Sequence, residues 1–473
     1  MVLGLGEGTP LANVDAAWWR MEHPTNLMTI TGVMAFPERI RFSQLKELIE
    51  DRLLGYDRFR QRVVESPLPF GRPRWVEDRH FNLRHHLQRV ALPDPGGKAE
   101  LQEMVSVLMS TPLDYSKPLW QFQYIENYRE GSALVARLHH CIADGIALVR
   151  LMLSMTDDSP TGSAVARRQR RQRRPLGGGT WLPEVVDDAF RSVRRMTNRG
   201  LRTVLDPERA KAAWRQATTS VSVTARLAAM PPDPDTLFRG RLCTRKICAW
   251  SEILPLDEVK AFGKAIGATI NDVLLAGVTG ALRSYMLQRG AQPAGIDLRA
   301  VLPVNLRPDD ELELLGNRFG LVFLALPVGV AGRGERLRVL KERMDAIKGS
   351  AEAVVTYAIL DAIGMTPPAV ETQAVRYFGS KATAVMTNVP GPRQTLYLAG
   401  APVRSLMFWV PQSARLGIGV SIISYAGQVR LGVVTDAGLV PDPDTLVAGF
   451  QEELRAMMAA PEEFRPPSPR RRA

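Results

Sequence analysis

The stretch Leu138-His139-His140-Cys141-Ile142-Ala143-Asp144-Gly145 decides both the fold and the chemistry that this chain is predicted to have. It follows an apolar run at residues 133–138, typical of a buried strand, and precedes an apolar run at residues 147–155, typical of a helix. An imidazole at a strand end can project into a cleft, and its ordinary pKa near neutrality suits a general base. We expect Asp144 either to pair with an arginine elsewhere or to orient the ring directly, and Gly145 to let the backbone turn tightly.

Other uses of these residue types are less favoured. His139, His140 and Asp144 could bind a metal in principle, but adjacent side chains at a strand end point to opposite faces and no third clustered ligand is visible, so no metal site is predicted. Cys141 could act as a nucleophile with His140, although their adjacency disfavours it and nothing local lowers the thiol pKa. The pair His85-His86 is expected to be structural or merely exposed. The serine-hydrolase pattern G-x-S-x-G and the Walker A pattern do not occur.

The composition is that of an ordinary globular protein of 473 residues, with 45% hydrophobic and 23% charged residues, which excludes wholesale disorder. Two or three domains are expected for this length. Three cysteines without a C-x-x-C pair argue against a disulfide framework or a zinc ribbon and favour a reducing, cytosolic setting. The sequence shows neither a secretory signal pattern nor an apolar run of about 18 residues, so no membrane span is predicted.

The positive charge is concentrated in one segment. The net charge is +12, and residues 161–220 carry 14 Lys or Arg against 5 Asp or Glu, a net +9, including six arginines within residues 167–174. A helical period with a basic face follows at residues 181–205. This helix can lie on an anionic membrane surface, or it can be a linker helix that packs its apolar stripe on the protein and leaves its arginines in water. No nucleic-acid-binding fold is visible, so nucleic acid is not a predicted partner.

Both halves of the chain show the same alternation of helix and strand patterns. This alternation predicts an α/β (α+β) fold of two lobes with mixed sheets. Thr269 is the expected N-cap of a helix at residues 271–287. Residues 417–423 and 428–435 are expected to form a hairpin joined at residues 425–427. The other expected helices lie at residues 14–21, 42–54, 101–109, 147–155 and 444–458, and the other expected strands at residues 27–36, 133–138, 298–304, 321–327 and 382–388. The expected organisation is a first lobe at 1–158, a basic linker at 159–235, a second lobe at 236–460 and a basic tail at 461–473.

The histidine stretch resembles the H-H-x-x-x-D-G signature of the CoA-dependent acyltransferase superfamily, which includes chloramphenicol acetyltransferase and peptide-synthetase condensation domains. The rest of the chain resembles, nearly end to end, the bacterial wax ester synthase/acyl-CoA:diacylglycerol acyltransferase family. Its departures are the double Trp18-Trp19, Asn305 and the arginine-rich linker. The matching pieces are Asp15-Ala16-Ala17-Trp18, Met21-Glu22-His23-Pro24-Thr25-Asn26, Pro112-Leu113-Asp114-Tyr115-Ser116-Lys117-Pro118-Leu119-Trp120, the histidine stretch, Thr269-Ile270-Asn271-Asp272-Val273-Leu274, Pro303-Val304-Asn305-Leu306-Arg307, Leu315-Gly316-Asn317 and Asn388-Val389-Pro390-Gly391-Pro392.

The resemblance implies two chloramphenicol-acetyltransferase-like lobes with an active-site tunnel at their interface. It implies transfer of a fatty acyl group from acyl-CoA, as a substrate, to diacylglycerol or a long-chain alcohol, with no cofactor. His140 would be the general base: it takes the proton of the acceptor hydroxyl and returns it to the departing CoA thiolate, so no acyl-enzyme is needed. His139 would shape the loop.

The resemblance also suggests roles for residues far from the histidines. Asn271 is the candidate donor to the oxyanion, because an amide donates without titrating and a helix N-terminus favours negative charge; the alternative is that it merely caps the helix. Asp272 would support this site. Asp144 would pair with Arg307 and so pin the two lobes together. Pro118-Leu119-Trp120 and Asn388-Val389-Pro390-Gly391-Pro392 are expected to be structural parts of the channel.

The sequence is also compatible with two other functions. One is a condensation-type acyltransferase whose donor is held by a carrier protein, and the other is a lipid-droplet-binding protein without catalysis. The expected location is cytoplasmic, with peripheral association at the inner membrane face or at lipid droplets. The oligomeric state, the acyl-chain length and the preference between diacylglycerol and a fatty alcohol are not predicted.

Overall fold

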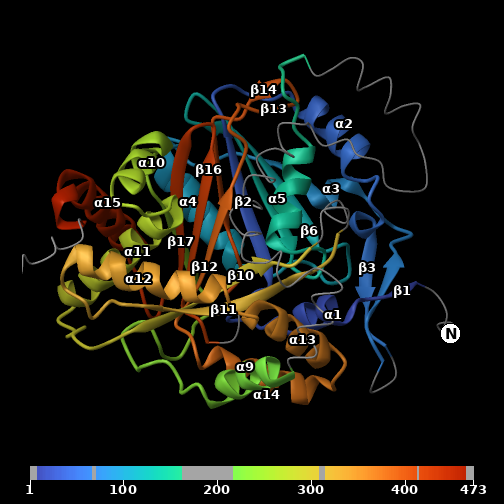
Figure 1. The fold of residues 1–473 in the computed structure, drawn as a ribbon. Coiled ribbons are helices and arrows are strands. Elements are labelled where there is room, and N and C mark those ends of the chain that lie inside the picture. Colours follow the sequence, from blue (N-terminus) through green and yellow to red (C-terminus); the bar gives the residue numbers. More distant parts are fainter. Residues whose placement is uncertain (1–7, 67–70, 162–216, 308–314, 413–414, 465–473) are drawn as a thin grey trace, which may run out of the picture.

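A computed structural model of the chain describes residues 8–66, 71–161, 217–307, 315–412 and 415–464. The chain folds into two halves, each built on a mixed β-sheet with helices packed against it (Figure 1). The predicted arginine run at 167–174, the predicted amphipathic helix at 181–205 and all but the first residues of the basic tail lie outside the described residues.

The sheet of the first half has five strands in the order β15-β2-β7-β6-β5. All nine residues of β7 are buried, as expected for an apolar strand at the centre of a sheet. The β5–β6 pair is parallel and the other pairs are antiparallel. The strands are β2 (Thr29–Phe36), β5 (Leu87–Val90), β6 (Trp120–Tyr128), β7 (Gly131–His139) and β15 (Ser405–Trp409).

The sheet of the second half has the order β11-β10-β12-β16-β17-β8, with β9 also paired to β17. Its β10–β12 and β12–β16 pairs are parallel, so this sheet is mixed as well. The strands are β8 (Lys246–Trp250), β9 (Leu254–Pro255), β10 (Leu298–Asn305), β11 (Phe319–Leu326), β12 (Ala384–Pro390), β16 (Ile418–Tyr425) and β17 (Gln428–Asp436). The predicted fold class of two α/β lobes is therefore confirmed.

The two halves exchange a strand. β15 comes from the second half of the sequence, yet it pairs antiparallel with β2, with Ser405 opposite Ala35 and Trp409 opposite Thr31. Trp409 is fully buried in the core of the first half. The predicted second lobe at 236–460 is thus not separate in space, because its residues 405–409 complete the sheet of the first lobe.

Helices cover the sheets of both halves (Figure 1). α11 is buried along most of its length and packs closely on α15, since a Cβ at Gly280 would lie 2.4 Å from Cδ of Glu453. α9, α13 and α14 lie together at one end of the molecule, at the bottom of Figure 1. The helices are α1 (Asn13–Arg20), α2 (Phe42–Arg52), α3 (Leu83–His86), α4 (Lys98–Ser110), α5 (Gly145–Ser154), α9 (Ala217–Ala229), α10 (Leu256–Ala265), α11 (Ile270–Gln288), α12 (Arg333–Lys348), α13 (Glu352–Gly364), α14 (Pro368–Gly379) and α15 (Pro443–Ala459).

Short elements complete the described chain. A separate three-stranded sheet is formed by β1 (Thr9–Pro10), β4 (Arg74–Glu77) and β3 (Gln61–Val64). β13 (Tyr397–Leu398) and β14 (Ala401–Pro402) pair with each other. Among the described helices none is by itself long and apolar enough to span a membrane; α10 and α11 pass that test only as a pair bent by 98°.

Two local predictions of the second half are confirmed. Thr269 caps α11: its hydroxyl accepts from the backbone N–H of Asp272, whose carboxylate accepts in return from the N–H of Thr269 at 2.9 Å. β16 and β17 form the expected hairpin. Its two central residues, Ala426 and Gly427, both have positive φ, of 48° and 76°, which is the type I′ geometry that matches the twist of the strands.

Candidate active site

His140 follows the last residue of β7 and lies in a buried, largely aromatic environment. Its backbone N–H donates to the carbonyl oxygen of Met28 at 2.7 Å, and its own carbonyl oxygen accepts from Nδ2 of Asn317 at 2.8 Å. The imidazole stacks on the indole of Trp18, with 4.1 Å between ring centroids, and lies 5.6 Å from the ring of Phe319. The residue is 5% exposed. The backbone of His140 is thus fixed by two hydrogen bonds, and its ring is fixed by stacking on Trp18.

Burial lowers the pKa of His140 to about 4, and the nearby Asp144 charge opposes this shift only in part. The ring is therefore neutral at neutral pH, which is the form that accepts a proton. Nδ1 is buried and has no hydrogen-bond partner among the described residues. An imidazole in this state can serve as a base, as the sequence predicts.

His139 lies in a different environment from its neighbour. It is fully buried, its Nδ1 accepts from the backbone N–H of Cys141 at 3.1 Å, and its ring packs edge-on against Tyr115. Because Nδ1 accepts, a neutral ring carries its proton on Nε2, which lies 3.5 Å from Oε2 of Glu22. These contacts are those of a residue that shapes the loop.

Asp144 connects the histidine loop to the second half. Oδ1 accepts from the N–H of Ala147 at 2.8 Å and so caps α5, while Oδ2 accepts from Nη2 of Arg307 at 2.7 Å and from the N–H of Arg318 at 3.2 Å. Of the two roles left open by the sequence, pairing with an arginine is the one that the contacts bear out, and the predicted contact with Arg307 is present.

The expectation for Gly145 is wrong. Its φ is not positive, and a Cβ there would meet its nearest neighbour, Cγ1 of Val410, at 3.8 Å, which is ordinary van der Waals distance. Gly145 is the first residue of α5, where a helical φ suits any residue. The positive φ in this region belongs to Gly316, at 115°, whose carbonyl oxygen accepts from the N–H of Asp144.

A buried cluster under His140 was not foreseen. Asp15 of α1 is fully buried, and its Oδ1 accepts from the backbone N–H and Nδ2 of Asn317, at 3.0 and 2.8 Å. Arg58 lies 3.1 Å from Oδ2 of Asp15 and also donates to the carbonyl oxygen of Ile142. Asp15, Trp18 and Asn317 all lie in pieces of sequence that carry the family resemblance, which was the signal available. Together they hold the backbone of the histidine loop.

Asn271 lies in the first turn of α11, but it is not the cap, since Thr269 and Asp272 fill that role. Its Oδ1 accepts from Nδ2 of Asn388 at 2.9 Å, which orients the amide and leaves its own Nδ2 to donate elsewhere. Asp272 is fully buried and acts as the capping carboxylate. The contacts of His140 among the described residues do not include Asn271, so its role at the oxyanion stays a prediction.

Pro118-Leu119-Trp120 braces the strand that carries the histidines. The carbonyl oxygen of Leu119 accepts from the backbone N–H of His139. The indole N–H of Trp120 donates to the carbonyl oxygen of Phe59 at 2.9 Å. His86 stacks on Trp120, with 4.6 Å between centroids, and its Nδ1 lies 2.8 Å from the carbonyl oxygen of that residue. The second histidine pair is therefore structural at His86.

The alternative chemistries find no support. Burial raises the pKa of the Cys141 thiol well above its ordinary value, which leaves it unreactive as a nucleophile. Within the described ranges, no three His, Cys, Asp or Glu side chains come together as a possible metal site.

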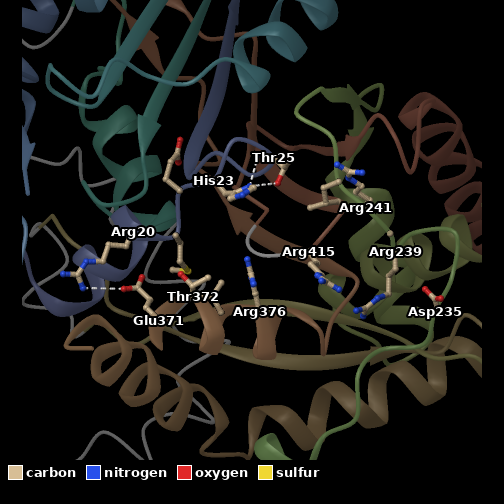
Figure 2. Close-up of a pocket in the computed structure, with 15 residues that line it drawn as sticks. Arg20, His23, Thr25, Asp235, Arg239, Arg241, Glu371, Thr372, Arg376 and Arg415 are labelled. Atoms are coloured by element: carbon tan, nitrogen blue, oxygen red, sulfur yellow. Dashed lines mark hydrogen bonds and ion pairs between the residues drawn. The ribbon is translucent and has the colours of Figure 1, made fainter. Parts of the chain in front are cut away.

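A cavity of about 770 Å³ opens between the halves beside this region (Figure 2). Residues of the α1–β2 connection, among them Met21 and Glu22, form one wall. The other walls come from residues 235–242, from α14 and from Arg415 before β16. Five of the lining residues are arginines: Arg20, Arg239, Arg241, Arg376 and Arg415.

Comparisons with known proteins agree with this geometry. The pattern described as the wax ester synthase/diacylglycerol acyltransferase catalytic domain matches residues 11–274, and that of the corresponding C-terminal domain matches residues 315–458. A Mycobacterium tuberculosis protein named probable diacylglycerol O-acyltransferase tgs1 is 29% identical over 464 residues, covering 95% of this chain and 96% of that protein. A second protein of that organism, also named as a diacylglycerol O-acyltransferase, is 30% identical over 420 residues, covering 86% of this chain and 85% of that protein.

Solved structures share the fold. The wax ester synthase/diacylglycerol acyltransferase of Marinobacter aquaeolei VT8 is 23% identical and superposes with a TM-score of 0.67, covering 96% of this chain and 100% of that one. The first condensation domain of the calcium-dependent antibiotic synthetase is 14% identical, with a TM-score of 0.62, and the match covers 96% of this chain and 97% of that one. The matched domains span most of the chain and include the histidine stretch. The chain belongs to the wax ester synthase/diacylglycerol acyltransferase family.

Proposed function

We propose that this protein transfers a fatty acyl group from acyl-CoA to the free hydroxyl of diacylglycerol, forming triacylglycerol. Acyl-CoA-dependent O-acyl transfer is the activity of the family, and the acceptor is the finer point of the proposal. The two Mycobacterium tuberculosis relatives described above, both named as diacylglycerol O-acyltransferases, support this acceptor. The observation that carries the chemistry is the neutral, buried imidazole of His140, stacked on Trp18 and tied through its carbonyl group to Asn317.

In the proposed reaction His140 accepts the proton of the acceptor hydroxyl as that oxygen attacks the thioester carbonyl carbon. Because Nδ1 is buried, Nε2 is the nitrogen that takes the proton. The tetrahedral intermediate collapses with cleavage of the C–S bond, and the CoA thiolate takes the proton from the imidazolium. Burial that keeps the ring neutral also makes the imidazolium a ready proton donor. General base catalysis of this kind contributes ~10²–10⁴-fold.

The oxyanion of the intermediate requires a donor, and we assign this role to Nδ2 of Asn271. The bond from Asn388 to Oδ1 of Asn271 supports the assignment, because it turns the amide so that the NH₂ group can donate. The N-terminal turn of α11 adds a favourable field for negative charge.

Diacylglycerol resides in a membrane or an oil phase, so the enzyme needs a reversible contact with such a surface. The segment 161–220, with its net charge of +9, is the proposed contact. The proposed location is accordingly cytoplasmic, at the inner membrane face or at lipid droplets.

A competition assay tests the function. Purified protein receives palmitoyl-CoA together with equal amounts of diacylglycerol and hexadecanol in mixed micelles, and the products are separated by lipid chromatography. We expect triacylglycerol to exceed hexadecyl palmitate. An excess of the wax ester would overturn the acceptor. Failure of both products, with product formed instead from palmitoyl bound to a carrier protein, would overturn the donor.

A further inference from the structure

The cavity between the halves has a lining that nothing in the acyl-transfer chemistry explains. Arg241, Arg376 and Arg415 are exposed, and none of their three side chains forms an ion pair or hydrogen bond with another residue in the part of the chain that the structure describes. Other exposed arginines of the described chain also lack a carboxylate partner, as Arg455 does. What distinguishes these three is that they line one cavity. Unpaired guanidinium groups gathered around one cavity are typical of a site for an anion.

The arginines of the cavity come from separate segments. Arg376 belongs to α14, Arg415 precedes β16, and Arg239 follows the connection from α9. Figure 2 shows Arg376 and Arg415 reaching into the same space, with the guanidinium group of Arg239 beside that of Arg415. Nη1 of Arg239 is already held by the carbonyl oxygens of Ser380 and Ala382, at 2.8 and 3.2 Å. Arg239 is thus a fixed positive charge, whereas Arg376 and Arg415 are available to a ligand.

The carboxylates of the cavity do not cancel this charge. Glu371 lies 3.5 Å from Arg20 and is 2% exposed, and burial raises its pKa to about 7, so it is only partly ionised at neutral pH. Glu22 is turned to His139 and to the backbone N–H of Met28. Asp235 lies on the far side of Arg239 from the centre of the cavity (Figure 2). The centre therefore faces Arg376 and Arg415 without an opposing carboxylate.

The cavity adjoins the reaction site without including it. Met21 and Glu22 line the cavity. Met21 packs against the cluster that contains Trp18, which stacks on His140, and Glu22 lies 3.5 Å from Nε2 of His139. One layer of side chains thus separates the cavity from the histidines. A donor whose anionic end and reactive thioester lie at opposite ends of a flexible arm matches this separation.

We propose that this cavity binds the phosphate groups of coenzyme A, with Arg376 and Arg415 as their principal ligands and Arg239 as the fixed charge behind them. The inference rests on the proposed function and names the residues that hold the donor. Coenzyme A carries a diphosphate and a 3′-phosphate at the end remote from its thiol, and guanidinium groups bind phosphate bidentately. A volume of about 770 Å³ is within the range of roughly 300–1,000 Å³ of small-molecule sites. A phospholipid headgroup offers the same phosphate chemistry, and the test separates the two.

The test uses the double variant Arg376→Gln/Arg415→Gln. Neither side chain bonds another described residue, so the variant is expected to keep its fold and its melting temperature. Arg455→Gln is the control for loss of a surface charge: it removes one exposed arginine from α15, remote from α14 in Figure 1. Binding of free CoA is measured by calorimetry, and binding to phosphatidylglycerol vesicles by co-sedimentation.

We expect the double variant to bind CoA at least about tenfold more weakly than wild type, and the control to bind within about twofold. The KM for decanoyl-CoA should rise with kcat unchanged, while the kinetics with decanoyl-pantetheine, which lacks phosphate, should stay the same. Equal CoA affinity of variant and wild type, or no CoA binding by wild type, would overturn the assignment. Lost vesicle binding with intact CoA binding would overturn it in favour of a headgroup. Arginine-dependent CoA binding without acyl transfer would leave this site standing and reject the proposed function.

Discussion

Oδ2 of Asp144 accepts a hydrogen bond from Nη2 of Arg307 at 2.7 Å, across 163 residues of sequence. The side chains are 5% and 6% exposed. Oδ1 of the same carboxylate caps α5. One side chain thus orders the helix after the histidines and joins their loop to the end of β10.

The charge of this pair can be separated from the cap. Asp144→Asn keeps an oxygen for the N–H of Ala147 but removes the carboxylate charge that faces the buried Arg307, which is expected to cost up to ~3–5 kcal/mol of unfolding free energy. Arg307→Met should give a similar loss. In urea unfolding the double variant should lose less than the sum of the two single losses, whereas strict additivity would show that the two residues do not interact.

Asn317 is expected to matter for both stability and rate. Asn317→Ala removes the donor to Oδ1 of Asp15 and to the carbonyl oxygen of His140, and leaves a buried carboxylate partly unsatisfied, at a cost of ~1–3 kcal/mol. The loop carrying His140 should shift, so that kcat falls with little change in KM. Gln292→Ala, an exposed amide in a loop, is the control. Unchanged stability in Asn317→Ala would contradict the role assigned to this cluster.

The pH dependence follows from the low pKa of His140, about 4 against an ordinary 6.5. The imidazole stays neutral in the folded protein as pH falls through 6.5, so kcat should not lose its base until about pH 5. The unfolded chain binds this proton below pH 6.5, whereas the folded protein binds it only near pH 4. The free energy of unfolding therefore falls as the pH decreases from 6.5 to 4, and this group does not change it above pH 6.5. A fall of kcat with a midpoint near 6.5 would show that the ring is less buried in the working enzyme.

The basic segment is expected to bind anionic membranes. Near-surface arginines are worth about 1 kcal/mol each, so replacing six of them should abolish much of the binding. The change to glutamine is made at Arg167, Arg168, Arg170, Arg171, Arg173 and Arg174. Co-sedimentation with phosphatidylglycerol liposomes across a salt series should show strong, salt-sensitive binding by wild type alone. Equal binding of both proteins at low salt would make the run a solvated linker.

Features determined by neighbouring residues could be predicted from the sequence. The capping box of Thr269 and Asp272 spans four residues, and the hairpin turn at Ala426-Gly427 depends on local backbone conformation. The pair of Asp144 and Arg307 is not local, and it was predicted only because the family resemblance connects the two positions.

Features that depend on distant partners could not be predicted. β15 has an ordinary apolar strand pattern, and nothing in it indicates that its partner is β2 of the other half. Asp15 reads as a charge on a surface helix, yet it is fully buried because Asn317, 302 residues away, and Arg58 satisfy it. The cavity arginines are equally dispersed in sequence. The tight turn expected at Gly145 was wrong for a different reason. A glycine can occupy a position whose backbone conformation any residue can adopt.

The central claim is that His140 is the base, and comparing His140→Ala with His139→Ala tests it most directly. Initial rates of triacylglycerol formation from palmitoyl-CoA and diacylglycerol are measured for both variants and wild type, with circular dichroism to show that each is folded. We predict that His140→Ala lowers the rate at least about 10²-fold, and that His139→Ala has a clearly smaller effect, because its ring is engaged with Cys141 and Glu22. A folded His140→Ala enzyme that is more active than His139→Ala would contradict the account.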